Sequence, residues 1–300
     1  MSMHNVSELG CTAAYVFAFR GPNLTIESYL EAIEDMARMG FTGLDLEILE
    51  DEHVAIYTDE RIRALRAHAR KHGVAFRAFT LWYAQKYLYS MDPVRRRRGL
   101  QLFEEGCRIV RALGIRQVHL GADVPGELAT KRSKEYPGGP PMGMLLGKTS
   151  WKKVWDTTVD VYRRAFAIAA RHGLRLGVEP RANSVIWSAD SFLTLQAAVH
   201  PRLGCVWDPM HAAYHREDSA LAIRKLGSSL MALQLCDADG EMMFHRPLGQ
   251  GRVDLKAIKN ALKAIAYRGP ILLELYHSGD ESKAKVDAYY QASKRAWERM

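Results

Sequence analysis

Short apolar runs alternate with longer amphipathic stretches along the whole chain. The runs are four to eight residues long, a length typical of strands buried in a parallel sheet. In the longer stretches, apolar residues recur every three or four positions, as at Leu30, Ile33 and Met36, which is typical of helices with one buried face. The runs predict eight strands, at 12–19, 43–49, 74–80, 117–120, 174–179, 203–207, 230–236 and 271–275.

The amphipathic stretches share a common ending. Five of them close on basic residues followed by a glycine, at Gly40, Gly73, Gly114, Gly173 and Gly269. Glycine adopts the left-handed conformation after a helix without a Cβ clash, and basic side chains are favourable at a helix C-terminus. The pattern predicts helices at 26–39, 59–71, 93–113, 151–171, 189–198, 219–226, 254–266 and 282–298.

Eight strands alternating with eight helices predict a parallel sheet. At 300 residues, a closed (β/α)8 TIM barrel forming one α/β domain over residues 1–300 is favoured. An open doubly wound sheet is the competitor, but no GxGxxG pattern follows the first run. The connection at 121–150 is long and rich in glycine and proline. Since it follows a strand, we expect it over the active face.

Composition is that of an ordinary globular domain, with 48% hydrophobic and 25% charged residues. The net charge of +8 would suit an anionic substrate or a nucleic acid. Part of the excess is the run Arg95–Arg98 near the start of an expected helix. Four consecutive helical residues point in four directions, so a solvated helix start is favoured over a basic patch for a partner.

No segment resembles a membrane span or a signal peptide. The longest apolar run, 11–19, has nine residues, against about 20 for a spanning helix. The four cysteines, Cys11, Cys107, Cys205 and Cys236, form no CxxC pair. We therefore expect reduced, buried thiols in a cytoplasmic protein that has no membrane partner.

Carboxylates and amides stand at the ends of the later strands. The fifth strand ends in Glu179, the sixth leads into Asp208, the seventh offers Gln234 and Asp237, and the eighth offers Glu274. The second strand offers Asp45 and Glu47 in the same way. In a barrel, the C-terminal ends of the strands converge on one site.

Carboxylates brought together there would repel one another unless they held protons or shared a cation. We predict one divalent ion on Glu179, Asp208, Gln234 and Glu274. Since all four offer oxygen, Mn²⁺ or Mg²⁺ is favoured over zinc. The alternative is that each acid caps a helix or pairs with an arginine such as Arg181.

The same residues carry a family resemblance. VEPRAN, VWDPMH, LQLCDADG with RPLGQG, and LLELYH together resemble the xylose-isomerase-like TIM barrels, in order and spacing over the whole chain. That superfamily includes sugar phosphate isomerases and epimerases, related dehydratases and endonuclease IV. The resemblance implies the same four metal ligands, and substrate contacts by His211 and Arg246. Gln234 departs from the histidine common in ketose 3-epimerases and looks more like hydroxypyruvate isomerases and some 3-dehydroshikimate dehydratases.

Metal-dependent proton abstraction next to a carbonyl is the chemistry that this site predicts. A cation would stabilise an enediolate, while Glu179 and Glu274 take and return the proton and His211 polarises the carbonyl or acts as base. The expected substrate is a small polar keto-sugar or polyol. Its contacts are predicted to be Glu47, Trp82, His211, His245 and Arg246, and His119 is expected to lie in the core.

Three alternatives remain open. The same enediolate can expel a β-substituent, which would make the protein a lyase or dehydratase acting on 3-dehydroshikimate or a 3-keto-glycoside. An endonuclease IV-like nuclease needs extra histidines for a metal cluster, which the expected strand ends lack, so no nucleic-acid partner is expected. A non-enzymatic binding barrel would not need so many carboxylates. A homo-oligomer, dimer or tetramer, is expected from the resemblance, with a second subunit as an option.

Overall fold

Eight parallel strands close into a barrel in chain order. The structure, a computed structural model, describes residues 9–21, 24–130, 143–275 and 281–300. Pairing of β1 with β8, in which Leu9 lies beside Ile271, closes the ring. The strands are β1 (Leu9–Cys11), β2 (Gly43–Ile48), β3 (Ala75–Leu81), β4 (Gln117–Gly121), β5 (Arg175–Glu179), β6 (Gly204–Trp207), β7 (Leu230–Leu235) and β8 (Ile271–Leu273).

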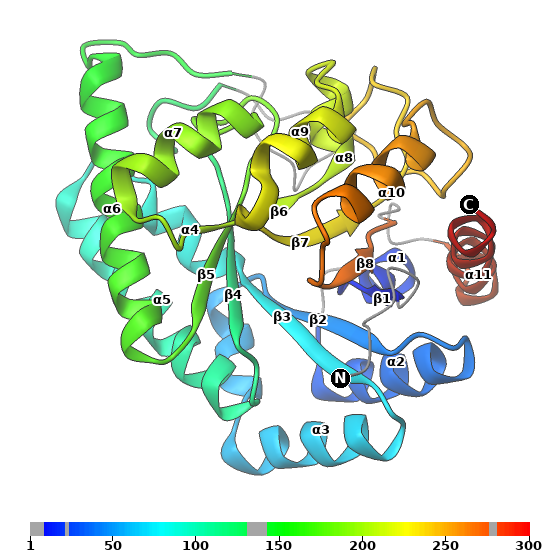
Figure 1. Cartoon of the computed structure of the whole chain (residues 1–300). Helices are drawn as coiled ribbons and strands as arrows, with labels where there is room; N and C mark the ends of the chain where they lie inside the picture. Colours follow the sequence, from blue (N-terminus) through cyan, green and yellow to red (C-terminus); the bar gives the residue numbers. More distant parts are fainter. Residues whose placement is uncertain (1–8, 22–23, 131–142, 276–280) are drawn as a thin grey trace.

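Helices surround the strands, and α1 and α11, from opposite ends of the chain, lie beside one another (Figure 1). The helices are α1 (Ala14–Arg20), α2 (Ile26–Arg38), α3 (Asp59–Lys71), α4 (Trp82–Leu88), α5 (Pro93–Ala112), α6 (Trp151–Arg171), α7 (Ala189–Val199), α8 (Pro209–Tyr214), α9 (Ser219–Leu226), α10 (Leu255–Ala264) and α11 (Lys283–Arg299), with 3-10 turns η1 (Asp51–Ile56) and η2 (Gly227–Ser229). The predicted TIM barrel is confirmed. All eight expected helices are present, each within two residues at either end.

The prediction for the first strand is wrong. Residues 12–19 were expected to be a strand, but β1 ends at Cys11 and helix α1 begins at Ala14. The first five residues of α1 are all buried, so the run shows no polar face, and periodicity cannot separate a buried helix from a buried strand.

Left-handed residues end most of the outer helices as predicted. Gly40, Gly73, Gly114 and Gly173 have φ between 69° and 79°, a conformation that a side chain rarely adopts. The fifth expected position differs. Helix α10 ends at Ala264, and the residue with positive φ after it is Ala266, at 50°, rather than the predicted glycine at 269.

All four cysteines are buried and free, as predicted. No helix in the described part of the chain is long and apolar enough to cross a membrane.

Residues 131–142 of the long connection lie outside the described residues. The described ends of this connection pair through an antiparallel bridge between Ala129 and Met144.

The buried histidine of β4 gives a pH-dependent test of the barrel interior. His119 is 1% exposed, and burial together with the positive charge of Arg175 lowers its pKa to about 3. In the unfolded chain its pKa returns to about 6.5. The unfolded state therefore binds the proton first as pH falls, so the stability that neutral His119 contributes above pH 6.5 decreases below that pH.

We predict that His119→Gln removes this dependence. Between pH 7.5 and 5.5, protonation of His119 in the unfolded chain lowers the unfolding free energy of the wild type by about 1.4 kcal/mol. The variant lacks this contribution. The measurement is urea unfolding of both proteins at the two pH values. If the difference in unfolding free energy between wild type and variant is the same at both pH values, His119 is not held neutral in the fold.

Candidate active site

The four predicted ligands lie at one end of the barrel. Glu179 is the last residue of β5, Asp208 directly follows β6, Gln234 is the penultimate residue of β7, and Glu274 directly follows β8. The first three are no more than 4% exposed, and the side chain of Glu274 is 15% exposed. Because the strands are parallel, their carboxyl ends meet at the same rim.

Asp208 is the most heavily bonded of the four. Its Oδ2 lies 2.8 Å from His245 Nε2 and 3.6 Å from His211 Nε2. Its Oδ1 accepts the backbone N–H of Met210 at 2.8 Å and the thiol of Cys236 at 3.2 Å. Burial acts to raise the pKa of Asp208, but the two histidines and these hydrogen bonds outweigh it and lower the pKa to about 2. Asp208 is therefore ionised, and it also caps helix α8.

His211, on α8, is held in one orientation by the loop after β5. Its Nδ1 accepts the backbone N–H of Ala182 at 3.3 Å. In the neutral ring the hydrogen must then sit on Nε2. Nε2 lies 3.2 Å from Glu179 Oε1, so the geometry presents His211 as a donor toward the site.

His245 lies deeper than the sequence suggested. It is 1% exposed, and its Nε2 stands between Asp208 and Glu274, whose Oε1 is 3.9 Å away. Burial opposes its charge, but the charge and hydrogen bond of Asp208, with the charges of Glu274 and Glu179, raise its pKa to about 9. In this arrangement its charge balances the neighbouring carboxylates, and the substrate contact of His245 stays a prediction.

Two oxygens in this group are buried without a hydrogen-bond partner. They are Gln234 Oε1 and Glu274 Oε2. Burial raises the pKa of Glu274 well above its ordinary value, and the charges of Asp208 and Glu179 add to this, while His245 opposes it. Unpartnered buried acceptors beside carboxylates are what a hard divalent cation satisfies, so the donor set fits such an ion.

The opposite wall of the site comes from β2. Glu47 accepts the indole N–H of Trp82 at 2.7 Å, and burial, with repulsion from Asp45, raises the pKa of Glu47. The guanidinium of Arg181 lies 4.8 Å from the Trp82 ring centre, and its Nε is 4.0 Å from Glu179 Oε1. Arg181 is 3% exposed, so these contacts connect the β2 and β5 walls.

Arg181 was considered in the sequence only as a possible counter-ion. Its position two residues after the strand-end Glu179 was the available signal. Arg181 pairs with Glu179 at 4.0 Å, as the alternative from the sequence expects, and its guanidinium lies over the Trp82 ring.

The loop after β7 is organised by Asp237. Its carboxylate accepts backbone N–H groups of Gly249, Gly251 and Val253 at 2.9–3.0 Å. A Cβ at Gly251 would lie 2.2 Å from Asp237 Oδ1, so the turn requires glycine there. The guanidinium of Arg246 in the same loop binds the carboxylate of Asp239. Its substrate contact remains a prediction.

Another potential ligand group lies outside the barrel. Glu34 Oε1 on α2 is 3.2 Å from His68 Nε2 and 3.9 Å from His72 Nε2 at the end of α3. Glu34 is half exposed, at 56%, and the group belongs to the outer helices. Any metal-content measurement must separate it from the barrel site.

These features define a closed (β/α)8 barrel with a carboxylate-rich C-terminal end. Residues 33–298 match the family described as xylose isomerase-like TIM barrel, and the chain belongs to that family. The resemblance inferred from the sequence is thereby confirmed.

Solved structures with the same fold include sugar epimerases. D-psicose 3-epimerase from Clostridium cellulolyticum, with D-tagatose, superposes with a TM-score of 0.77 at 18% identity, covering 97% of this chain and 98% of that one. The 3-keto-D-glucoside 4-epimerase of E. coli gives 0.72 at 18%, covering 97% and 98%. The IOLI protein with a bound zinc atom gives 0.73 at 13%, covering 97% and 98%.

One curated relative is similar in sequence over part of the chain. Over 132 residues the chain is 30% identical to a 3-dehydroshikimate dehydratase of Pseudomonas putida, covering 40% of this chain and 21% of that protein. The chain thus matches about a fifth of the length of that curated relative.

Gln234→Leu tests the cation site without removing a charge. Leucine has a similar volume and leaves no unpartnered oxygen. We predict that the metal-free variant is at least as stable as metal-free wild type, while its affinity for Mn²⁺ falls at least about tenfold. Calorimetric titration with Mn²⁺ and thermal unfolding with and without EDTA measure both quantities.

His68→Gln is the matched control for the outer group. This variant should still bind one Mn²⁺ per chain. Its Tm should still fall by about 5 °C or more when the metal is chelated, because a bound ligand stabilises the folded state. The barrel site would be refuted if His68→Gln abolished metal binding while Gln234→Leu left it unchanged.

Proposed function

We propose that this protein is a divalent-cation-dependent isomerase or epimerase acting on a small keto-sugar or polyol-like substrate. One observation carries the proposal: Glu179 and Asp208 are buried and Glu274 is only 15% exposed at the strand ends, with unpartnered oxygens on Gln234 and Glu274. Buried, unbalanced carboxylates in a barrel mouth are typical of metal-assisted or acid–base sites.

Glu179, Asp208, Gln234 and Glu274 would hold the cation, which we propose to be Mn²⁺ or Mg²⁺ because oxygen dominates the set. When bound, it would act as a Lewis acid toward the substrate's carbonyl and hydroxyl oxygens. Asp208, fixed by His245 and by the N-terminus of α8, supplies a permanently ionised oxygen.

Proton movement is assigned to two carboxylates on different sides of the ring. Glu179 comes from β5 and Glu274 from β8. One would remove the proton next to the carbonyl and the other would deliver a proton to the second position.

His211 is assigned as the polarising group. Since its Nδ1 accepts the Ala182 N–H, its Nε2–H, which faces Glu179 Oε1 at 3.2 Å, would be the group that donates to a substrate oxygen. Of the two roles expected from the sequence, polarising the carbonyl is therefore favoured over acting as a base. Glu47 and Trp82 would form the opposing wall, with His245 and Arg246 at the β7 loop.

A lyase is the second candidate. The similarity to the Pseudomonas putida dehydratase favours it, and the same carboxylates can remove a proton so that a β-substituent leaves. Homo-oligomer formation, the absence of a nucleic-acid partner and a cytoplasmic location remain predictions.

Deuterium exchange separates the two reactions. Candidate keto-sugars and 3-dehydroshikimate are incubated with the Mn²⁺-loaded protein in D₂O and followed by NMR. Deuterium next to the carbonyl without an eliminated product supports isomerase or epimerase chemistry, and an eliminated product supports the lyase. A panel with neither exchange nor elimination would contradict both.

Glu274→Gln tests the assigned proton carrier. We predict a fall in kcat of about 10²–10⁴-fold, with an unchanged circular dichroism spectrum. Glu241→Gln, which changes an exposed carboxylate of the β7 loop, is the matched control and should keep its rate. Wild-type turnover in Glu274→Gln would remove Glu274 from catalysis.

A further inference from the structure

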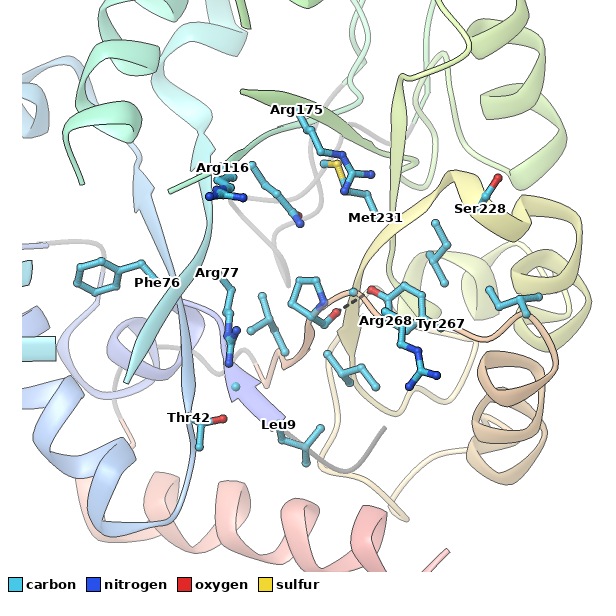
Figure 2. Close-up of a pocket in the computed structure, with 18 of the residues that line it drawn as sticks. Leu9, Thr42, Phe76, Arg77, Arg116, Arg175, Ser228, Met231, Tyr267 and Arg268 are labelled. Carbon is cyan, nitrogen blue, oxygen red and sulfur yellow. Dashed lines mark hydrogen bonds between the residues drawn. The ribbon is translucent and has the colours of Figure 1, made fainter. Parts of the chain in front are cut away.

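A cavity lies at the end of the barrel where the strands begin, opposite the candidate active site. It has a volume of about 600 Å³ and is lined by Leu9 of β1, Gln117 of β4, Met231 of β7 and Ile271 of β8 (Figure 2). This volume is within the range of small-ligand sites. The candidate active site is at the C-terminal ends of the same strands, so the two sites do not share residues.

Four arginines surround this cavity. Arg77 lies in β3, Arg116 directly precedes β4, Arg175 is the first residue of β5, and Arg268 lies in the turn before β8 (Figure 2). The lining contains no aspartate or glutamate among the described residues. None of the ion pairs within that same part of the chain involves Arg77, Arg116 or Arg175.

Arg77 is directed by an irregularity in the sheet. Leu44 pairs with Phe76 and Asp45 pairs with Ala78, so Arg77 is the extra residue of a bulge. Bulges redirect a side chain locally. A Cβ at Gly43 on the neighbouring strand would lie 2.9 Å from Arg77 Cγ, so glycine leaves the room that the arginine stem occupies.

Like charges gathered in a concave surface repel one another, and a bound anion would relieve that repulsion. A guanidinium presents paired N–H groups that match the oxygens of a phosphate. Ser228, exposed at the cavity edge, adds a hydroxyl group. These features call for an anion with several charges in a small volume.

We propose that this arginine cavity binds a small, multiply charged phosphate-type anion, such as a diphosphate or a phosphorylated metabolite. The site is separate from the proposed catalytic one. It requires neither the metal nor the isomerase assignment, and it can be tested in protein whose catalytic function is unknown.

Inorganic pyrophosphate is the probe, titrated calorimetrically into the full chain with ionic strength held constant by NaCl. Saturable binding of about one pyrophosphate per chain is expected, with a raised Tm. Arg116→Gln combined with Arg175→Gln should weaken Kd at least about tenfold. Both side chains are exposed, so the double variant should fold.

Matched controls remove charge elsewhere. Arg97→Gln with Arg202→Gln changes two exposed arginines outside the cavity lining and should leave pyrophosphate binding unchanged. Glu274→Gln should also bind normally, which separates this proposal from the catalytic one. Ser228→Glu, which places a carboxylate at the cavity edge, should weaken binding about tenfold and fold normally.

The proposal is overturned if pyrophosphate shows no saturable binding at constant ionic strength. Equal weakening by the cavity and control double variants would also overturn it, since net charge alone would then explain the affinity. Tighter binding of citrate than of pyrophosphate would reject the phosphate assignment.

Discussion

Carboxylates cannot be buried side by side without something that balances their charge, and the C-terminal end of this barrel is built around that constraint. An ionised carboxylate in the interior costs several kcal/mol unless it is paired and hydrogen-bonded. Asp208 meets the condition through His245 at 2.8 Å and a helix N-terminus. Glu274 does not, because its Oε2 lacks a partner and its pKa is raised. A divalent cation on Glu274, Gln234, Glu179 and Asp208 would supply the missing balance.

The surrounding loops hold this arrangement in place. Asp208 fixes α8, and α8 carries His211, whose ring is oriented by the Ala182 N–H of the β5 loop. The carboxylate of Asp237 accepts three backbone N–H groups of the loop after β7 and so fixes its conformation. His245 belongs to this loop and contacts Asp208. The carboxylates are therefore positioned by rigid connections, as a pre-organised site requires.

Much of the fold was accessible from the sequence because strand and helix periods differ. Seven of the eight expected strands match within two residues. The first did not, because the first five residues of α1 are all buried and show no polar face. Strand ends such as Glu179 were visible as single polar residues after apolar runs. The position of His245 was not, because it depends on a loop that returns across 37 residues to Asp208. The arginine cavity was equally hidden, since Arg77 and Arg268 are far apart in the chain and line one cavity only when the barrel closes.

The central claim is that one cation sits at the C-terminal end of the barrel. Crystals grown with Mn²⁺ and measured at the manganese absorption edge test it most directly. The account predicts one anomalous peak per chain, about 2.1–2.3 Å from oxygens of Glu179, Asp208, Gln234 and Glu274. The absence of a peak there, or a peak only at Glu34, His68 and His72, would contradict it.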